Sequence, residues 1–283
     1  MNTGMKATLI VLALAAVGGF ILLGRTSGRG APAPAQPTGI HVFAPCGMTD
    51  PIGAAAQQFR RQHPEIPLEI SYDNAVILVR RVREGARPDV FISPGELEMR
   101  QLTDEGYLDR GSVRDFGTYE LVLIVPRTVT SVHTLDDLRG ESVRHIALAD
   151  PANNSVGEYA QAALKSLGLW DSLKPKLLLR YRALEAITLV TSGKVEAGLA
   201  YNTCPLESAP EKADKANVRL IATLPQASYP RVRCQVGVLA SSKVKRQALV
   251  FSDFLRSAQA QALLASKGLP NMPAAERSRS ARR

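Results

Sequence analysis

The sequence lacks the short motifs that mark several common catalytic sites. It contains no Gly-x-Ser-x-Gly turn, no phosphate-binding loop, no His-Glu-x-x-His pair and no Cys-x-x-Cys. These absences argue against the corresponding hydrolases, nucleotide-binding enzymes, zinc peptidases and thiol redox catalysts. The four histidines show no metal-ligand spacing, and they are His41, His63, His133 and His145. We therefore predict a protein that is not an enzyme and that carries no cofactor.

The N-terminus has the composition of an export signal. Residues 7–24 form an apolar run without charge, flanked by basic residues. We predict that residues 1–25 are a signal peptide or a retained membrane anchor, and the run suits both. The Gly-, Pro- and Ala-rich residues 26–38 are expected to be a flexible linker. The expected location is periplasmic or extracytoplasmic, with tethering by an uncleaved N-terminal helix as the alternative to cleavage.

The basic residues gather at the two ends of the chain. The formal net charge is +9, but the leader and residues 273–283 hold most of it, and about +3 remains on the part between them. We expect residues 273–283 to form a disordered basic tail. A small charge on the folded part argues against a surface for polyanions, so no nucleic-acid partner is predicted.

Between the linker and the tail, segments typical of strands alternate with segments typical of helices. Apolar strands are predicted near residues 40–44, 89–93 and 145–149, each followed by a helix. This alternation predicts an α/β fold with mainly parallel sheets flanked by helices. We expect two lobes with a ligand cleft between them. The first lobe is predicted at 39–122, the second at 123–203, and a return segment to the first lobe at 204–272.

Several strands end in short turns of small polar residues that lead into helices. They are the turns at 45–49, 73–75, 93–95 and 153–156. Thr49 or Asp50, and also Asn74, are expected to cap the helices that follow, and Ser155 with Glu158 has the capping-box pattern. Unpaired amides and the helix dipole make such turns anion sites without any lysine or arginine.

Three segments carry a resemblance to a known family. They are Phe43-Ala44 with Thr49-Asp50, residues 87–93 (Arg-Pro-Asp-Val-Phe-Ile-Ser), and Asp150-Pro151 with residues 156–160 (Val-Gly-Glu-Tyr-Ala). Together they resemble the molybdate-binding proteins of ABC transporters, which are type II periplasmic solute-binding proteins. The resemblance spans about residues 40 to 270. It implies a monomer that captures a small inorganic oxyanion, such as molybdate or tungstate, and presents it to an ABC permease in the membrane.

The resemblance also implies which residues hold the ligand. The family encloses its oxyanion with serine hydroxyls, helix-start amides and one tyrosine hydroxyl. Gly47 and Asn74-Ala75 stand where the family has serines, so the ligand site diverges from the family pattern. The ligand-binding residues that it implies are Cys46, Gly47, Met48, Asn74, Ala75, Val156, Ala183 and Tyr201.

The three cysteines leave several interpretations open. A Cys204–Cys234 disulfide is one, because exported proteins form disulfides. A site for a thiophilic metal or metalloid, made by Cys46, Cys204 and Cys234, is another, since soft ligands select soft ions. Inert packing is the third. A nucleophilic Cys46 at a helix start would need a nearby base, and none is indicated. A sensory binding module of the same architecture is a further alternative function.

Overall fold

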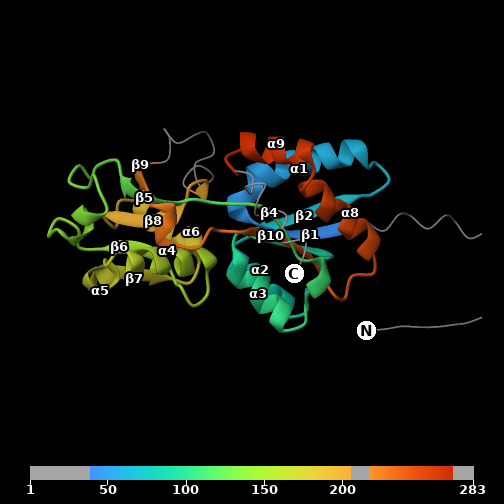
Figure 1. Cartoon of the computed structure of the whole chain (residues 1–283), viewed down its shortest axis with the longest axis horizontal. Coiled ribbons are helices and arrows are strands. Elements are labelled where there is room, and N and C mark those ends of the chain that lie inside the picture. Colours follow the sequence, from blue (N-terminus) through green and yellow to red (C-terminus); the bar gives the residue numbers. More distant parts are fainter. Residues whose placement is uncertain (1–38, 205–216, 270–283) are drawn as a thin grey trace, which may run out of the picture. The chain divides into compact units, whose positions relative to one another are not determined.

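The computed structural model describes residues 39–204 and 217–269. The predicted leader at 1–25, linker at 26–38 and basic tail at 273–283 lie outside these residues. The described residues form two five-stranded sheets with helices against them (Figure 1). The described helices include none that is both long and apolar enough to cross a membrane. The predicted α/β architecture with two lobes is confirmed.

The sheet of the first lobe has the order β2-β1-β3-β10-β4. β1 pairs in parallel with β2 and β3, while β10 runs antiparallel to both β3 and β4. Four strands therefore share one direction and β10 opposes them. The strand bounds are β1 Ile40–Pro45, β2 Leu68–Asp73, β3 Val90–Ser93, β4 Arg114–Gly117 and β10 Cys234–Val238.

The sheet of the second lobe repeats this plan in the order β7-β6-β8-β5-β9. β6 is parallel to β7 and β8, and β5 is antiparallel to β8 and β9. β5 is thus the one reversed strand of the described sheet. The bounds are β5 Leu121–Pro126, β6 Ile146–Ala149, β7 Leu177–Arg180, β8 Ala197–Tyr201 and β9 Val218–Thr223.

Helices cover both faces of the first sheet (Figure 1). Alternate residues of β1 point to opposite faces, as the pleat requires. Val42 and Ala44 belong to one buried cluster together with Phe59, whereas Phe43 belongs to another with Leu78. The helices of this lobe are α1 Thr49–Gln62, α2 Ala75–Arg83, α3 Glu96–Asp104, α8 Lys245–Leu255 and α9 Ala258–Ser266.

The second sheet is sandwiched in the same way. Val122 and Ile124 of β5 share a cluster with Val190 of α6, while Leu123 shares the large cluster with Ala160 of α4. The helices here are α4 Ser155–Ser166, α5 Trp170–Leu173 and α6 Ala183–Thr191. Short 3-10 turns complete the described elements, and they are η1 Cys46–Met48, η2 Arg110–Ser112, η3 Asp136–Arg139, η4 Lys174–Lys176 and η5 Gln226–Ser228.

The chain passes between the two sheets at residues 118–120 and again at 224–233. Both boundaries differ from the predicted ones. The second lobe begins before 123, and the return segment does not begin at 204, because β9 pairs with β5 at an edge of the second sheet. The position of an edge strand depends on a partner far away in the sequence, so local pattern did not reveal it. The crossings explain the two reversed strands, since β5 and β10 each enter their sheet from the cleft.

Local helix signals also gave some wrong expectations. Neither Thr49 nor Asp50 caps α1, because η1 precedes the helix and the Thr49 hydroxyl donates to the Cys46 carbonyl instead. Asn74 is at the N-cap of α2, but its side chain makes no capping bond. The capping box at Ser155 is not formed, since α4 already begins there. The amphipathic pattern of residues 247–266 predicts a single helix, but the structure has two, α8 and α9.

Candidate functional site

A cavity of about 260 Å³ lies between the two lobes, at the carboxyl ends of the parallel strands. In α/β sheets this is where ligands bind. Residues of both lobes line it: Pro45, Cys46, Gly47, Thr49, Asn74, Ala75, Pro94, Glu98 and Tyr119 from the first lobe or its crossing, and Asn154, Ser155, Val156, Ala183, Leu184, Ile187, Tyr201 and Cys204 from the second.

Four helix starts meet at this cavity. Gly47 and Ala75 lie at the starts of η1 with α1 and of α2, while Val156 and Ala183 lie in the first turns of α4 and α6. The first N–H groups of a helix have no partner within it, and the dipole places partial positive charge there. The cavity is therefore lined by backbone donors that suit an anion, and its lining residues within 39–204 and 217–269 include no lysine, arginine or histidine.

The structure brings together most of the residues that the resemblance implied. Cys46, Gly47, Asn74, Ala75, Val156, Ala183 and Tyr201 all line the cavity. Met48 does not. Its side chain is fully buried in the core, because the 3-10 turn of η1 directs it inward.

Tyr201 ends β8 and stands at the centre of a set of contacts between the lobes. Its ring stacks on Tyr119 at 4.8 Å between centroids, and its hydroxyl donates to Ser155 Oγ over 3.1 Å. The Tyr119 hydroxyl donates to the Gly47 carbonyl, and the Thr203 hydroxyl does the same. Burial raises the pKa of Tyr201 well above its usual range, so its hydroxyl remains a neutral donor.

Two side chains of the first lobe bond to helix starts of the second. The Leu184 amide donates to Asn74 Oδ1 over 3.3 Å, at the start of α6. The Ser155 amide donates to Glu98 Oε1 over 3.0 Å, at the start of α4. Each acceptor satisfies an amide that the helix leaves unpaired. Asn74 Oδ1 accepts from the Leu184 amide in the other lobe, and this explains why Asn74 does not cap its own helix.

Glu98 is, with Tyr119, among the lining residues that sequence reasoning missed. Its side chain is buried, with 1% exposure, and it contributes the only carboxyl group among the described residues that line the cavity. The available signal was its position in the first turn of α3, directly after the loop at 93–95 that the sequence analysis singled out. Its partner Ser155 lies 57 residues away in the other lobe, so spacing alone could not show the contact.

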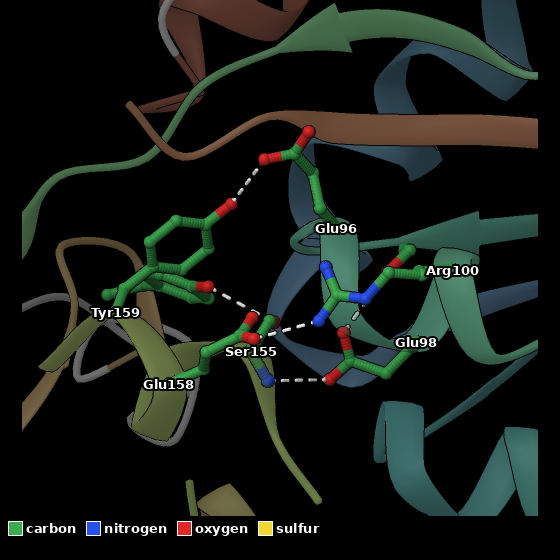
Figure 2. A network of polar contacts seen from close by, with 8 residues as sticks. Glu96, Glu98, Arg100, Ser155, Glu158 and Tyr159 are labelled. Carbon is green, nitrogen blue, oxygen red and sulfur yellow. Dashed lines mark hydrogen bonds and ion pairs between the residues drawn. The ribbon is translucent and has the colours of Figure 1, made fainter. Parts of the chain in front are cut away.

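Further contacts between α3 and α4 surround this bond (Figure 2). The Tyr159 hydroxyl donates to Glu96 Oε2 over 2.9 Å, and Arg100 pairs with Glu158 at 2.8 Å. Burial, followed by the Glu96 charge, raises the pKa of Tyr159 and keeps this hydroxyl protonated. The Arg100–Glu158 pair is partly exposed and screened by water, so it adds little stability.

The positions of the three cysteines fit neither the disulfide nor the three-cysteine metal site. None of the three is part of a disulfide, so the Cys204–Cys234 bridge is absent. Cys46 and Cys204 line the cavity, whereas Cys234 is fully buried with its Sγ directed to the Pro94 carbonyl at 3.7 Å. No group of three metal-ligating side chains occurs in the described part of the chain. Burial raises the pKa of the Cys234 thiol well above its usual range.

The fold and the cavity together define a two-lobed binding protein whose cleft is lined by hydrogen-bond donors suited to an anion. The sequence pattern of the bacterial extracellular solute-binding protein family matches residues 40–269, and the chain belongs to this family. YvgL of Bacillus subtilis, provisionally named an ABC transporter substrate-binding lipoprotein, is 25% identical over 90% of this chain and 95% of its own length.

Two molybdate-binding proteins are also similar to the chain. The molybdate-binding protein ModA of Escherichia coli is 28% identical over 78% of this chain and 84% of its own length. The solved periplasmic molybdate-binding protein of Azotobacter vinelandii superposes with a TM-score of 0.67 at 20% identity, covering 83% of this chain and 99% of that structure. The structural similarity to the Azotobacter vinelandii protein shows that the two chains share a fold.

Proposed function

We propose that this protein captures a small inorganic oxyanion of the molybdate or tungstate type outside the cytoplasm and delivers it to an ABC permease. The observation that carries the proposal is the convergence of four helix starts and Tyr201 on one cavity between the lobes. Neutral donors of this kind bind an anion by hydrogen bonds and by the helix dipoles. The similarity to the molybdate-binding protein of Escherichia coli supports the same ligand class.

The proposed mechanism is closure of the two lobes about the ligand. Residues 118–120 and 224–233 are the two crossings about which such a hinge would turn. An anion that bonds to amides of α2 from one side and of α6 from the other stabilises the closed arrangement. In doing so it would take over from Asn74 Oδ1, which bonds to the start of α6 in the present structure. We expect the protein to act as a monomer that binds no nucleic acid.

The amide at the start of α6 offers a direct test. Ala183 is the first residue of α6, a position where proline is tolerated. Arg182 before it already has the extended backbone that a following proline requires, with φ −108° and ψ 133°. Ala183→Pro therefore removes one N–H donor and keeps the helix. One charge-assisted hydrogen bond contributes about 1.5–3 kcal/mol, so the affinity for molybdate should fall by roughly 10- to 150-fold in calorimetry.

The matched control is Ala258→Pro at the start of α9. Ser257 before it is extended at φ −64° and ψ 152°, and α9 does not line the cavity. This control should leave the affinity unchanged. The wild-type protein is titrated with molybdate, tungstate, sulfate, phosphate, arsenite and soft metal ions, with and without reductant. Binding of the thiophilic species alone, and only in reductant, would contradict the proposal and favour Cys46 and Cys204 as ligands.

A further inference from the structure

Glu98 is an acidic residue in a cavity whose other polar groups are mainly neutral hydrogen-bond donors. It is an acid on the wall of a proposed anion site, and an ionised carboxylate there would repel the ligand. No lysine, arginine or histidine forms an ion pair with Glu98 among residues 39–204 and 217–269. A buried charge without a counter-ion is costly, and a carboxyl group in this position avoids the cost by taking a proton.

The hydrogen bonds around Glu98 fit the protonated acid. Ser93 Oγ lies 2.6 Å from the Gly95 carbonyl and 3.3 Å from Glu98 Oε2. A serine hydroxyl has one hydrogen, and the much closer Gly95 carbonyl, which can only accept, takes it. Ser93 Oγ is then left as an acceptor, so the hydrogen between it and Oε2 comes from Glu98. Meanwhile Oε1 accepts from the Ser155 amide, as the carbonyl oxygen of a neutral acid does.

The groups that face Glu98 from neighbouring elements do not reverse this argument. Burial is the largest influence on the pKa of Glu98 and raises it, against the opposing effect of hydrogen bonds, of which the bond from the Ser155 amide is the largest. On α3 itself, Arg100 is already paired with Glu158 of α4. The other titratable groups of the surrounding elements are two buried hydroxyls, a buried thiol, a bonded carboxylate and the α2 guanidiniums, which interact elsewhere: Tyr159, Tyr201, Cys234, Glu96, Arg80, Arg81 and Arg83. Cys46 and Cys204 also line the cavity.

We propose that closure of the cleft on the oxyanion is coupled to the uptake of one proton by Glu98. When the lobes are apart, water solvates the carboxylate and it is ionised at neutral pH. On closure, one Glu98 oxygen takes a proton from solution and forms an O–H bond that donates to Ser93 Oγ. The neutral acid then stands beside the anion without repelling it. This inference rests on the proposed function and specifies how that site tolerates an anion.

The coupling predicts how affinity depends on pH. Between the pKa of Glu98 in the open protein and its higher pKa in the complex, each unit of pH rise should weaken molybdate binding about tenfold, because one proton is taken up per anion. Calorimetry at pH 7 in two buffers of different ionisation enthalpy should report an uptake approaching one proton. Zero uptake, together with an affinity that is flat from pH 6 to pH 8.5, would overturn the inference.

Glu98→Gln separates the proton from the side chain. The glutamine amide can donate to Ser93 Oγ while its oxygen accepts from the Ser155 amide, so both bonds of the protonated acid are kept. This variant should bind molybdate with an affinity that is independent of pH and with no proton uptake. Glu96→Gln is the matched control, since it removes one negative charge from the same helix two residues away and should retain the pH dependence of the wild type.

The outcomes distinguish the two proposals. Binding to the wild type without proton uptake contradicts the role of Glu98 and leaves oxyanion capture intact. The same pH dependence in the wild type and in Glu98→Gln also contradicts it. No binding of molybdate, tungstate, sulfate or phosphate to either protein at pH 6, with both folded by circular dichroism, contradicts oxyanion capture itself.

Discussion

At the scale of single residues, the cavity combines positions that follow from local sequence with one that does not. Val156 and Ala183 line it through their place at helix starts, and a strand-turn-helix pattern is enough to predict that place. Met48 was expected at the site, but its side chain does not line the cavity, because a 3-10 turn rotates it into the core. Glu98 faces the cavity because of a partner in the other lobe, so no local pattern could select it.

The buried acid should also affect the stability of the closed protein with molybdate bound, the state in which Glu98 is proposed to be protonated. Burial raises the folded-state pKa of Glu98 above its unfolded value. The folded protein then binds this proton more tightly than the unfolded chain does. The contribution of Glu98 to stability is fully present below the unfolded pKa and is lost as pH rises through the folded pKa. The window therefore opens at about pH 4.3 and extends upward.

Glu98→Gln should consequently gain stability relative to the wild type as pH rises through this window. The difference in unfolding free energy should grow by at most about 1.4 kcal/mol per pH unit, which is the limit for one proton. Urea denaturation of both proteins in saturating molybdate, from pH 4 to pH 8, measures it. A difference that stays constant with pH would show that Glu98 does not change its protonation on folding.

At the scale of elements, periodicity predicts well where apolar residues are buried in a regular pattern. It predicts a strand at 197–201 and a helix at 75–83, and the structure has both with these bounds. The strand is buried along its length, and the helix packs its apolar face into a buried cluster with Phe43. The ends of elements were harder to predict. The expected caps at Asn74 and Ser155 are replaced by contacts across the cleft, and tertiary partners of this kind leave no trace in local spacing.

The break between α8 and α9 shows a cap that periodicity concealed. Ser257 Oγ accepts from the Ala260 amide over 3.2 Å and begins α9 after the turn at Arg256. Ser257→Ala removes this cap and should destabilise the protein by about 1 kcal/mol in thermal or urea unfolding. Ser257→Asp supplies another capping oxygen and should recover most of the loss. Equal stability of the alanine and aspartate variants would contradict the capping role.

At the scale of the whole described body, two sheets of the same plan are joined by a pair of crossings. Each sheet holds one reversed strand, β5 or β10, which is the strand that the chain enters after a crossing. This arrangement places the carboxyl ends of the parallel strands of both sheets at the cleft. The lobes then touch through α3 and α4, beside the cavity (Figure 2). Gly95, just before α3, packs directly against Ser155 at the start of α4.

Gly95 provides the test of whether this approach is needed for binding. A Cβ atom at Gly95 would lie 2.4 Å from Ser155 Cβ and 2.5 Å from its Oγ, which is closer than atoms can pack. The backbone at Gly95 is extended, with φ −161°. Alanine adopts this conformation readily, so the substitution adds no backbone strain within the first lobe. Gly95→Ala should therefore leave each lobe folded and hold the two apart. Molybdate affinity should fall at least about tenfold, because the amides of one lobe no longer reach an anion held by the other.

The decisive comparison combines calorimetry with small-angle X-ray scattering. If closure accompanies binding, saturating molybdate should reduce the radius of gyration of the wild type and not that of Gly95→Ala. Gly111→Ala is the matched control, because its Cβ would meet nothing closer than Asp109 Oδ1 at 3.5 Å, on the exposed side of the first lobe. That variant should behave as the wild type does. Unchanged affinity and full compaction in Gly95→Ala would mean that the lobes grip the anion without the close approach of α3 to α4, and that a wider cleft is the binding state.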